Sequence, residues 1–265
     1  MPELIVFTDL DGTLLDHDTY AYDDARPGLD RLAAEGVPLV LVSSKTRPEI
    51  EELRARLGNR HPFVPENGGA IFIPRDCGLD IPPGAKAMGD YRVILLGRPR
   101  SEIAPLFDRL AAKFPVRALS RLDPREIVVL TGLTLEQARQ AAAREFGEAF
   151  ILDDPSVPVS ELAAAVAELG LRLTGGGRFH HLLAENDKGR AVRILIDLYK
   201  KRHPGLVSAA VGDAPNDRPM LAEVDRPFLV ARKDGTHHQV DVPGLVKINE
   251  PGPTGFAKAM LFLLP

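Results

Sequence analysis

Three observations predict an α/β protein whose core is a Rossmann-like parallel sheet covered by helices. Apolar runs of strand length alternate with amphipathic segments near the start of the chain, polar residues follow several of these runs directly, and the same alternation returns near the end. Strands of a parallel sheet are buried on both faces and therefore read as nearly continuous apolar runs. The stretch between the two alternating regions is expected to be a second α/β domain inserted into this core.

The first part of the core is expected at residues 1–83. Hydrophobic periodicity and helix-start signals predict, in chain order, a strand at 4–7, a helix at 24–35, a strand at 37–42, a helix at 47–57 and a hairpin within 62–74. Proline and glycine are then concentrated at 74–90, which predicts a domain boundary there.

The inserted domain is expected at 84–185 and the second part of the core at 186–265. For the insertion we predict strands at 92–96, 127–131 and 149–152, helices at 101–113, 135–146 and 160–169, and a turn at 174–177 between two further strands. Two β-α-β units of this kind predict an open sheet with helices on one side. The returning core should contain a helix at 188–202, a strand at 206–211, a helix at 215–223, a strand at 228–230 and a final helix at 255–264.

Composition excludes several classes of function. The chain has 265 residues, 45% of them hydrophobic, and a formal net charge of −4, without a basic cluster interleaved with aromatics, so nucleic acid is not expected as a partner. No apolar run approaches the roughly 18 residues of a membrane span, and acids at Glu3 and Asp9 interrupt the N-terminal run, so we expect neither a membrane segment nor a signal peptide. The single cysteine, Cys77, fits a reducing cytoplasm.

Polar side chains follow three predicted core strands at the points where these strands end. A single carboxylate after a strand is usually a turn residue or a helix cap, but ligands of open parallel sheets bind beyond the carboxyl ends of the strands. The polar groups expected to meet at this rim are Asp9 and Asp11, Ser43 and Ser44, Asp213 and Asp217, and Lys188 at the start of a helix.

This set of groups suits phosphoryl transfer. The carboxylates of Asp9, Asp213 and Asp217 and the carbonyl of Asp11 are hard oxygen ligands of the kind that Mg²⁺ prefers; the alternative for Asp217 is a helix cap. Lys188 and the Ser43 hydroxyl can hold a phosphoryl group. Asp9 can attack phosphorus to form an aspartyl phosphate, while Asp11 moves protons to the leaving oxygen and from the hydrolytic water.

Four segments together resemble the motifs of the haloacid dehalogenase superfamily. They are DLDGTLLD at 9–16, a hydroxyl residue ending the second strand, Lys188 in DKGRAV, and GDAPND at 212–217. The resemblance implies Asp9 as nucleophile, Asp11 as acid and base, Ser43 and Lys188 on phosphate, and Asp213 with Asp217 at the metal. With an aspartate at position 11, the chain resembles the phosphatases and mutases of the superfamily. The inserted segment resembles the C2B-type caps of the superfamily. One extra residue after the second strand leaves Ser43 and Ser44 as alternatives, with Ser43 favoured.

Three further segments narrow the resemblance within the superfamily. SSKTR at 43–47, ENGGAIFIP at 66–74 and RFHHL at 178–182 resemble the mannosyl-3-phosphoglycerate phosphatase family. This implies removal of phosphate from 2-O-mannosyl-3-phosphoglycerate to give mannosylglycerate, a compatible solute typical of thermophiles. The alternatives are a phosphatase of glucosyl-3-phosphoglycerate, a hexose phosphate or sucrose phosphate, or a non-catalytic binding module, which would be expected to lose Asp9, Asp11 or Lys188.

Six residues are expected to contact the sugar or the carboxylate of such a substrate: Lys45, Arg47, Glu66, Asn67, Arg178 and His180. Strand alternation puts Arg178 and His180 on one face, with Phe179 and His181 on the other. The alternatives are that Arg47 only begins a helix, that Glu66 and Asn67 only form a hairpin turn, and that His180 is a structural histidine. The loop at 131–134 is another candidate contact. No oligomeric state is predicted.

Overall fold

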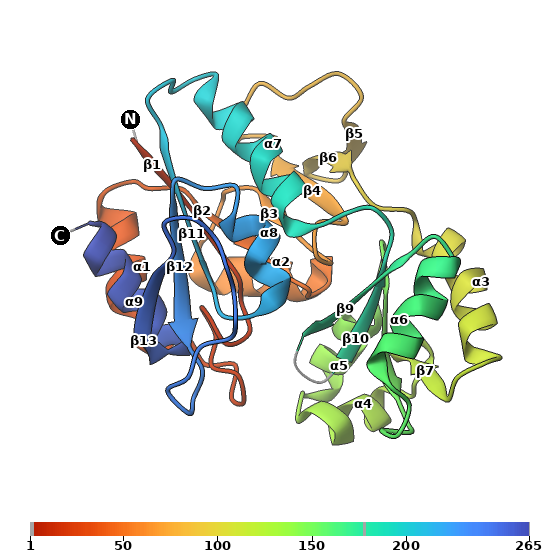
Figure 1. Cartoon of the computed structure of the whole chain (residues 1–265). Coiled ribbons are helices and arrows are strands. Elements are labelled where there is room, and N and C mark those ends of the chain that lie inside the picture. The colour runs from red at the N-terminus through yellow and green to blue at the C-terminus, as the bar shows by residue number, and fades with distance from the viewer. Residues whose placement is uncertain (1–2, 177–178, 265) are drawn as a thin grey trace.

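The computed structural model describes residues 3–176 and 179–264, which form two β-sheets with helices packed on both (Figure 1). The larger sheet has nine strands among the described residues. Their spatial order is β13 (Val246–Pro251), β12 (Arg226–Ala231), β11 (Val207–Gly212), β1 (Leu4–Thr8), β2 (Leu39–Val42), β3 (Phe63–Val64), β4 (Ala70–Pro74), β6 (Tyr91–Leu95) and β5 (Lys86–Met88). Neighbouring strands from β13 to β3 pair in parallel, whereas β4, β6 and β5 at one edge are joined by antiparallel pairings. This arrangement confirms the α/β class with a parallel core.

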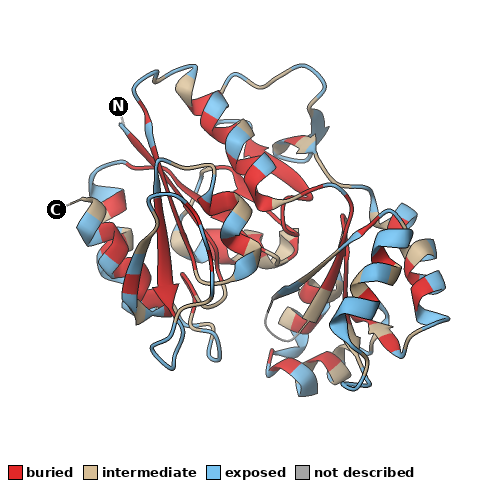
Figure 2. Ribbon diagram, in the orientation of Figure 1, coloured by how far each residue is buried: buried red, intermediate tan, exposed pale blue. Residues whose placement is uncertain are grey.

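Both faces of the larger sheet are buried along its central strands, which are red in Figure 2, whereas the edge strands β5 and β13 are largely exposed. Along β1, Leu4 and Val6 point to one face, while Ile5 and Phe7 point to the other, as the two-residue period of a strand requires. The first face is covered by α1 (Arg26–Ala34), α2 (Arg47–Leu57) and α9 (Gly252–Leu263), and the second by α7 (Lys188–Lys200) and α8 (Arg218–Leu221). Short 3₁₀ turns lie at Asp23–Ala25, Leu119–Arg121 and Pro215–Asp217.

The smaller sheet is antiparallel and is inserted between β6 and α7. Its spatial order is β7 (Val116–Ala118), β8 (Glu148–Leu152), β10 (Phe179–Leu183) and β9 (Arg172–Gly176). One face packs against α3 (Arg100–Ala111) and α6 (Val159–Glu168). On the other side lie α4 (Pro124–Thr131) and α5 (Leu135–Ala142), so helices are not confined to one side as predicted.

The prediction of a strand at 127–131 is wrong. Although this run is rich in β-branched residues, Asp123 caps a helix by accepting a hydrogen bond from Arg125 N–H at 2.7 Å, and Gly132 ends it at φ 77°. Burial follows helical spacing, since Ile127 and Thr131 are buried while Val129 is 84% exposed.

Two other boundaries also differ from prediction. The run at 92–96 was expected in the insertion, but β6 pairs with β4 from Ala70 opposite Leu95 to Pro74 opposite Tyr91, so residues 86–95 extend the nine-stranded sheet. The prolines and glycines before it therefore form a loop of the core rather than a linker. In the insertion, the expected turn at 174–177 is wrong for 174–176, which belong to β9. The sequence pattern also did not predict the short strand β7 in the insertion, or β5 and β13 in the core.

The segment between α5 and β8 docks the smaller sheet onto the core. Glu66 has φ 49°, and its buried carboxylate accepts hydrogen bonds from the backbone N–H groups of Glu145 (2.7 Å) and Phe146 (3.1 Å). A Cβ on Gly69 would lie 2.4 Å from Cβ of Phe146, so only glycine permits this approach. The hairpin turn at 66–69 is thus a contact surface for the insertion.

None of the helices in the described part of the chain combines the length and the apolar character that a membrane crossing needs.

α9 packs closely against the end of β13 at Gly255, and this leads to a testable prediction. A Cβ there would lie 2.2 Å from the Glu250 carbonyl oxygen and 2.8 Å from Val230 Cγ1. We expect Gly255→Ala to lower the free energy of unfolding by about 1–3 kcal/mol, because the added methyl overpacks a buried helix. Gly205→Ala, whose Cβ would meet nothing within 4 Å, is the matched control in urea denaturation. Equal stability of the two variants would contradict this packing.

Candidate active site

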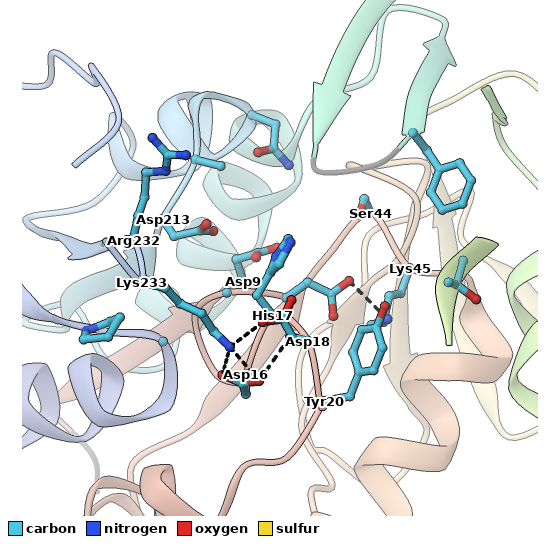
Figure 3. A pocket seen from close by; sticks show the side chains of 18 of the residues that line it. Asp9, Asp16, His17, Asp18, Tyr20, Ser44, Lys45, Asp213, Arg232 and Lys233 are labelled. Atoms are coloured by element: carbon cyan, nitrogen blue, oxygen red, sulfur yellow. Dashed lines mark hydrogen bonds and ion pairs between the residues drawn. The ribbon is translucent and has the colours of Figure 1, made fainter. Parts of the chain in front are cut away.

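A cavity of about 780 Å³ lies between the two sheets, at the carboxyl ends of the core strands. The core contributes Asp9, Asp11 and Asp213 to its lining, and the insertion contributes Arg144 and His181. Figure 3 shows Asp9 and Asp213 together on the core side, with Lys45 and Tyr20 across the cavity. The topology explains why the cavity lies there. In the sheet, β2 lies on one side of β1 and β11 lies on the other, and open α/β sheets bind ligands where the strand order reverses in this way.

Lys188 joins two of the predicted carboxylates. Its Nζ donates to Asp9 Oδ1 at 2.5 Å and to Asp217 Oδ1 at 2.6 Å, and all three side chains are buried. The other oxygen of Asp217 accepts the backbone N–H groups of Asp213 (3.0 Å) and Ala214 (3.1 Å). Burial by itself would lower the pKa of Lys188, but Asp217 and Asp9 raise it above its ordinary value, so Lys188 carries a charge.

Asp9, Asp213 and Asp217 form an acidic cluster in which one carboxylate oxygen of each lies within 4.8 Å of the others. Burial raises the pKa of Asp9 to about 7, and Asp217 adds to this against the opposing effect of Lys188. Burial, Asp217 and Asp9 likewise raise the pKa of Asp213 well above its ordinary value. One lysine therefore does not balance three carboxyl groups, of which Asp9 and Asp217 are buried and Asp213 half-buried, and the donor set of hard oxygens fits a divalent cation of the Mg²⁺ type.

Asp11 lies on the Lys45 side of the cavity. Its Oδ2 is 3.1 Å from Lys45 Nζ, while its Oδ1 is buried without a hydrogen-bond partner among the described residues. The Lys45 ammonium is also 3.4 Å from Glu49 and 4.7 Å from the centre of the Tyr20 ring. Asp11 thus keeps one carboxylate oxygen available, two residues along the chain from Asp9.

The two serines after β2 differ in position. Ser43 is 1% exposed, and its Oγ accepts a hydrogen bond from Lys45 N–H at 3.1 Å. Ser44, not Ser43, is among the residues that line the cavity. Both nevertheless lie at the strand end predicted from the sequence.

Three of the four expected substrate contacts from the core lie outside the cavity lining. The guanidinium of Arg47 is 2.8 Å from Glu145 Oε1 and 3.3 Å from Glu51, which makes it part of the docking contact between insertion and core. Glu66 holds the segment after α5, and Asn67, with φ 54°, is buried in the turn beside it. Only Lys45 of the four core residues expected to contact the sugar or the carboxylate lines the cavity.

The two histidines of β10 lie on the opposite faces of the smaller sheet to those predicted. His181 and Phe179 line the cavity, whereas His180 packs on the other face with its ring 5.4 Å from that of Phe150. Alternation along the strand was correct, but the assignment of faces was wrong, because the sequence does not tell which face α3 and α6 cover. Arg178, the other expected contact, lies outside the described residues.

Arg144 was missed by sequence reasoning. It follows α5, is 8% exposed, and lines the cavity from the insertion. The sequence pattern places Arg144 in a helix at 135–146, but α5 ends at Ala142, and the segment that follows it turns onto the core. The outer rim was also missed: Lys233 lies between Asp16 (3.0 Å) and Asp18 (2.7 Å), as Figure 3 shows, and so joins two loops of the core.

Known proteins resemble this chain in sequence and in fold. Residues 6–78 match the family described as haloacid dehalogenase-like hydrolase. A Methanococcoides burtonii protein named glucosyl-3-phosphoglycerate/mannosyl-3-phosphoglycerate phosphatase is 40% identical over 98% of this chain and 97% of its own length. A Pyrococcus furiosus mannosyl-3-phosphoglycerate phosphatase is 36% identical over 85% of this chain and 90% of its own. A Thermoplasma acidophilum crystal structure superposes with a TM-score of 0.70 at 16% identity, covering 99% of this chain and 98% of the other.

The chain belongs to the haloacid dehalogenase superfamily of hydrolases, and it is a phosphatase related to those that act on mannosyl-3-phosphoglycerate.

The excess of buried carboxylates predicts an unusual pH dependence for Asp213→Asn in the presence of a chelator. Because the folded-state pKa of Asp213 is raised above 3.8, its contribution to stability is present below that value and is lost as pH rises through the folded-state pKa. Asn mimics the protonated carboxyl group, so the variant should gain in melting temperature over the wild type as pH rises.

The matched control is Asp234→Asn, which lines the same cavity. Hydrogen bonds from Thr236 lower the pKa of Asp234, so this substitution should not stabilise the protein at high pH. Melting curves of the wild type and the two variants between pH 5 and pH 8, all with chelator, test the direction of the change in melting temperature. A melting temperature for Asp213→Asn that falls below the wild type at pH 8 would contradict the electrostatic picture.

Proposed function

We propose that this protein is a Mg²⁺-dependent phosphatase that removes phosphate from 2-O-mannosyl-3-phosphoglycerate through an aspartyl-phosphate intermediate. The observation that carries this is the cluster of Asp9, Asp213 and Asp217, in which Lys188 pairs with Asp9 and Asp217, while Asp9 and Asp213 line a cavity of about 780 Å³. The names of the relatives support the substrate. Because one relative is named for both sugars, glucosyl-3-phosphoglycerate is the second candidate substrate.

In this proposal Asp9 is the nucleophile. Its Oδ2 attacks phosphorus while Lys188 holds Oδ1, and the bond from phosphorus to the glycerate oxygen breaks. Asp9, Asp213, Asp217 and the carbonyl of Asp11 would hold Mg²⁺, which when bound supplies positive charge next to the phosphoryl oxygens. Ser43 occupies the position that the family motif gives to the phosphate-binding hydroxyl, and Ser44 beside it lines the cavity.

Asp11 is the proton-transfer group of the proposal. Its protonated carboxyl gives a proton to the leaving glycerate oxygen, and the resulting carboxylate then takes a proton from the water that hydrolyses the phosphorylated Asp9. Lys45 orients Asp11 by its contact with Oδ2 at 3.1 Å, which leaves Oδ1 for the reacting groups.

We further propose that residues 98–185 act as a cap, in place of the 84–185 expected from the sequence. Arg144, Phe179 and His181 line the cavity from this part, so a closing movement would surround the substrate and exclude water from the phosphorylated enzyme. The single cysteine fits a cytoplasmic location for this enzyme.

Phosphate release by the purified protein tests the proposed substrate. We expect Mg²⁺-dependent release that is fastest with mannosyl-3-phosphoglycerate, slower or equal with glucosyl-3-phosphoglycerate, and much slower with hexose phosphates, sucrose phosphate and free 3-phosphoglycerate. Addition of a chelator should stop it. Turnover confined to hexose or sucrose phosphates would reject the proposed substrate, and unchanged turnover in chelator would reject the metal.

Substitution of the two catalytic aspartates separates their roles. We expect Asp9→Asn to abolish turnover, since the amide is not a nucleophile, and Asp11→Asn to lower kcat by about 10²–10⁴-fold with a smaller change in KM. Asp18→Asn, which removes an exposed carboxylate from the cavity rim, is the control. Circular dichroism should show all three folded. Wild-type turnover in Asp9→Asn, or an unchanged kcat in Asp11→Asn, would remove the corresponding assignment.

A further inference from the structure

We propose that Arg144, with His181 beside it, binds the carboxylate of the substrate's glycerate group and so makes the enzyme selective for phosphoglycerates. This inference rests on the proposed function, because it assumes a substrate that carries a carboxylate next to its phosphate. It assigns a role to a residue of the insertion that neither the sequence pattern nor the acidic cluster explains.

Arg144 is held at the junction of insertion and core with its side chain in the cavity. The side chain is 3% exposed, one terminal nitrogen donates to the Ser44 carbonyl at 3.3 Å, and Nε lies 3.4 Å from Glu66 Oε2. The docking of the segment after α5 onto Glu66 fixes this position. An arginine at such a site is oriented by both parts of the molecule, so it can respond to their closure.

The contacts within the protein do not use the whole donor capacity of Arg144. Its Nε faces Glu66 Oε2 at 3.4 Å and one terminal nitrogen donates to the Ser44 carbonyl, so these contacts involve two of its three guanidinium nitrogens. The carboxylate of Glu66, the nearest acid, already accepts the N–H groups of Glu145 and Phe146. A guanidinium has five N–H donors in a planar fork that matches a carboxylate. The buried cation therefore has room for a second anionic partner.

The other cations that line the cavity differ from Arg144 because their acidic partners also line it. Lys45 contacts Asp11 and Glu49, Lys233 contacts Asp16 and Asp18, and Arg232 lies 3.7 Å from Asp234. Glu66, by contrast, does not line the cavity and is turned towards the backbone of the insertion. Among these cations, Arg144 presents the charge that a substrate anion can approach without meeting an acid of the cavity wall.

His181 provides a neutral hydrogen-bonding group at the same place. It lines the cavity, is 6% exposed, and its Nδ1 is buried without a hydrogen-bond partner among the described residues. Burial and the charge of Arg144 hold the pKa of His181 well below its ordinary value, so the ring is neutral near pH 7. A neutral ring can hydrogen-bond to a carboxylate or an adjoining hydroxyl, and the unpartnered Nδ1 of His181 is suited to such a bond.

The position also matches the chemistry of the substrate. In a 3-phosphoglycerate, one carbon atom separates the carboxylate carbon from the carbon that carries the phosphate, so the two anions bind close together. Arg144 contacts the carbonyl of Ser44, the residue that follows the proposed phosphate contact Ser43. The carboxylate site is therefore next to the proposed phosphate site, and the sugar on the middle carbon is left for the rest of the cavity.

Substitution of Arg144 tests the inference by selectivity. We expect Arg144→Gln to lower kcat/KM for mannosyl-3-phosphoglycerate by about 10- to 100-fold, mainly through KM, since charged hydrogen bonds to the carboxylate are lost. Hydrolysis of p-nitrophenyl phosphate, which has no carboxylate, should change less than about threefold. Arg144→Lys, which keeps the charge but not the fork, should show a smaller loss.

Arg47→Gln is the matched control, because it removes an arginine from the same junction but outside the cavity lining. It should leave the ratio of the two kcat/KM values unchanged. If Arg144→Gln is unstable, Arg144→Lys gives the same comparison. An equal loss on both substrates in the Arg144 variants, or no loss on either, would overturn the assignment.

A binding measurement separates this inference from the proposed function. By calorimetry, the wild type should bind 3-phosphoglycerate more tightly than glycerol 3-phosphate, which has a hydroxymethyl group in place of the carboxylate, and Arg144→Gln should remove the difference. This result would support the carboxylate site even if no sugar phosphoglycerate were hydrolysed. Equal affinity of the wild type for the two ligands would reject the carboxylate site whatever the enzyme's substrate is.

Discussion

Charge balance around Lys188 is the constraint on which the site depends. A single buried ammonium contacts Asp9 and Asp217, and Asp213 lies beside them with its pKa raised by burial and by its neighbours. Removing such charges from water is costly unless they are paired, so the arrangement requires that β1, β11 and the start of α7 meet closely. The parallel sheet satisfies this requirement because it brings the carboxyl ends of its strands to one rim. The remaining negative charge makes the cluster suitable for a cation and a phosphate ester together.

The second determinant is the docking of the insertion by its segment after α5. Glu66 accepts two backbone N–H groups of this segment, Arg47 pairs with Glu145, and Gly69 allows Phe146 to approach. These contacts close the cavity on the side opposite the acids and place Arg144 in its wall. Residues that resemble substrate contacts in the sequence therefore serve the junction, while a residue without any motif reaches the cavity.

The two parts of the cavity wall thus have different chemical characters. The core side contributes carboxylates, among them Asp9, which pairs with the buried Lys188 behind the wall, and this chemistry suits the phosphoryl group that is common to all phosphate esters. The insertion contributes an arginine, a neutral histidine and Phe179, which suit recognition of the group that carries the phosphate. Because the two parts of the wall have separate roles, changes in the insertion can alter substrate specificity while the reaction stays the same.

By itself, the sequence determined the α/β class and most of the core elements, and it predicted that Asp9, Asp11, Lys188, Asp213 and Asp217 lie near one another, because strand-end polar residues of a parallel sheet converge whatever the details of packing. Tertiary structure decided the matters that depend on long-range burial. The β-branched run at 127–131 became a helix because its caps and its one-sided burial favour helical spacing, and residues 86–95 joined the core because β4 offered an edge to pair with. His181 faces the cavity, and His180 does not, because α3 and α6 cover the other face of the smaller sheet. Alternation along a strand predicts two faces, and only the packing of distant segments determines which of them meets the substrate.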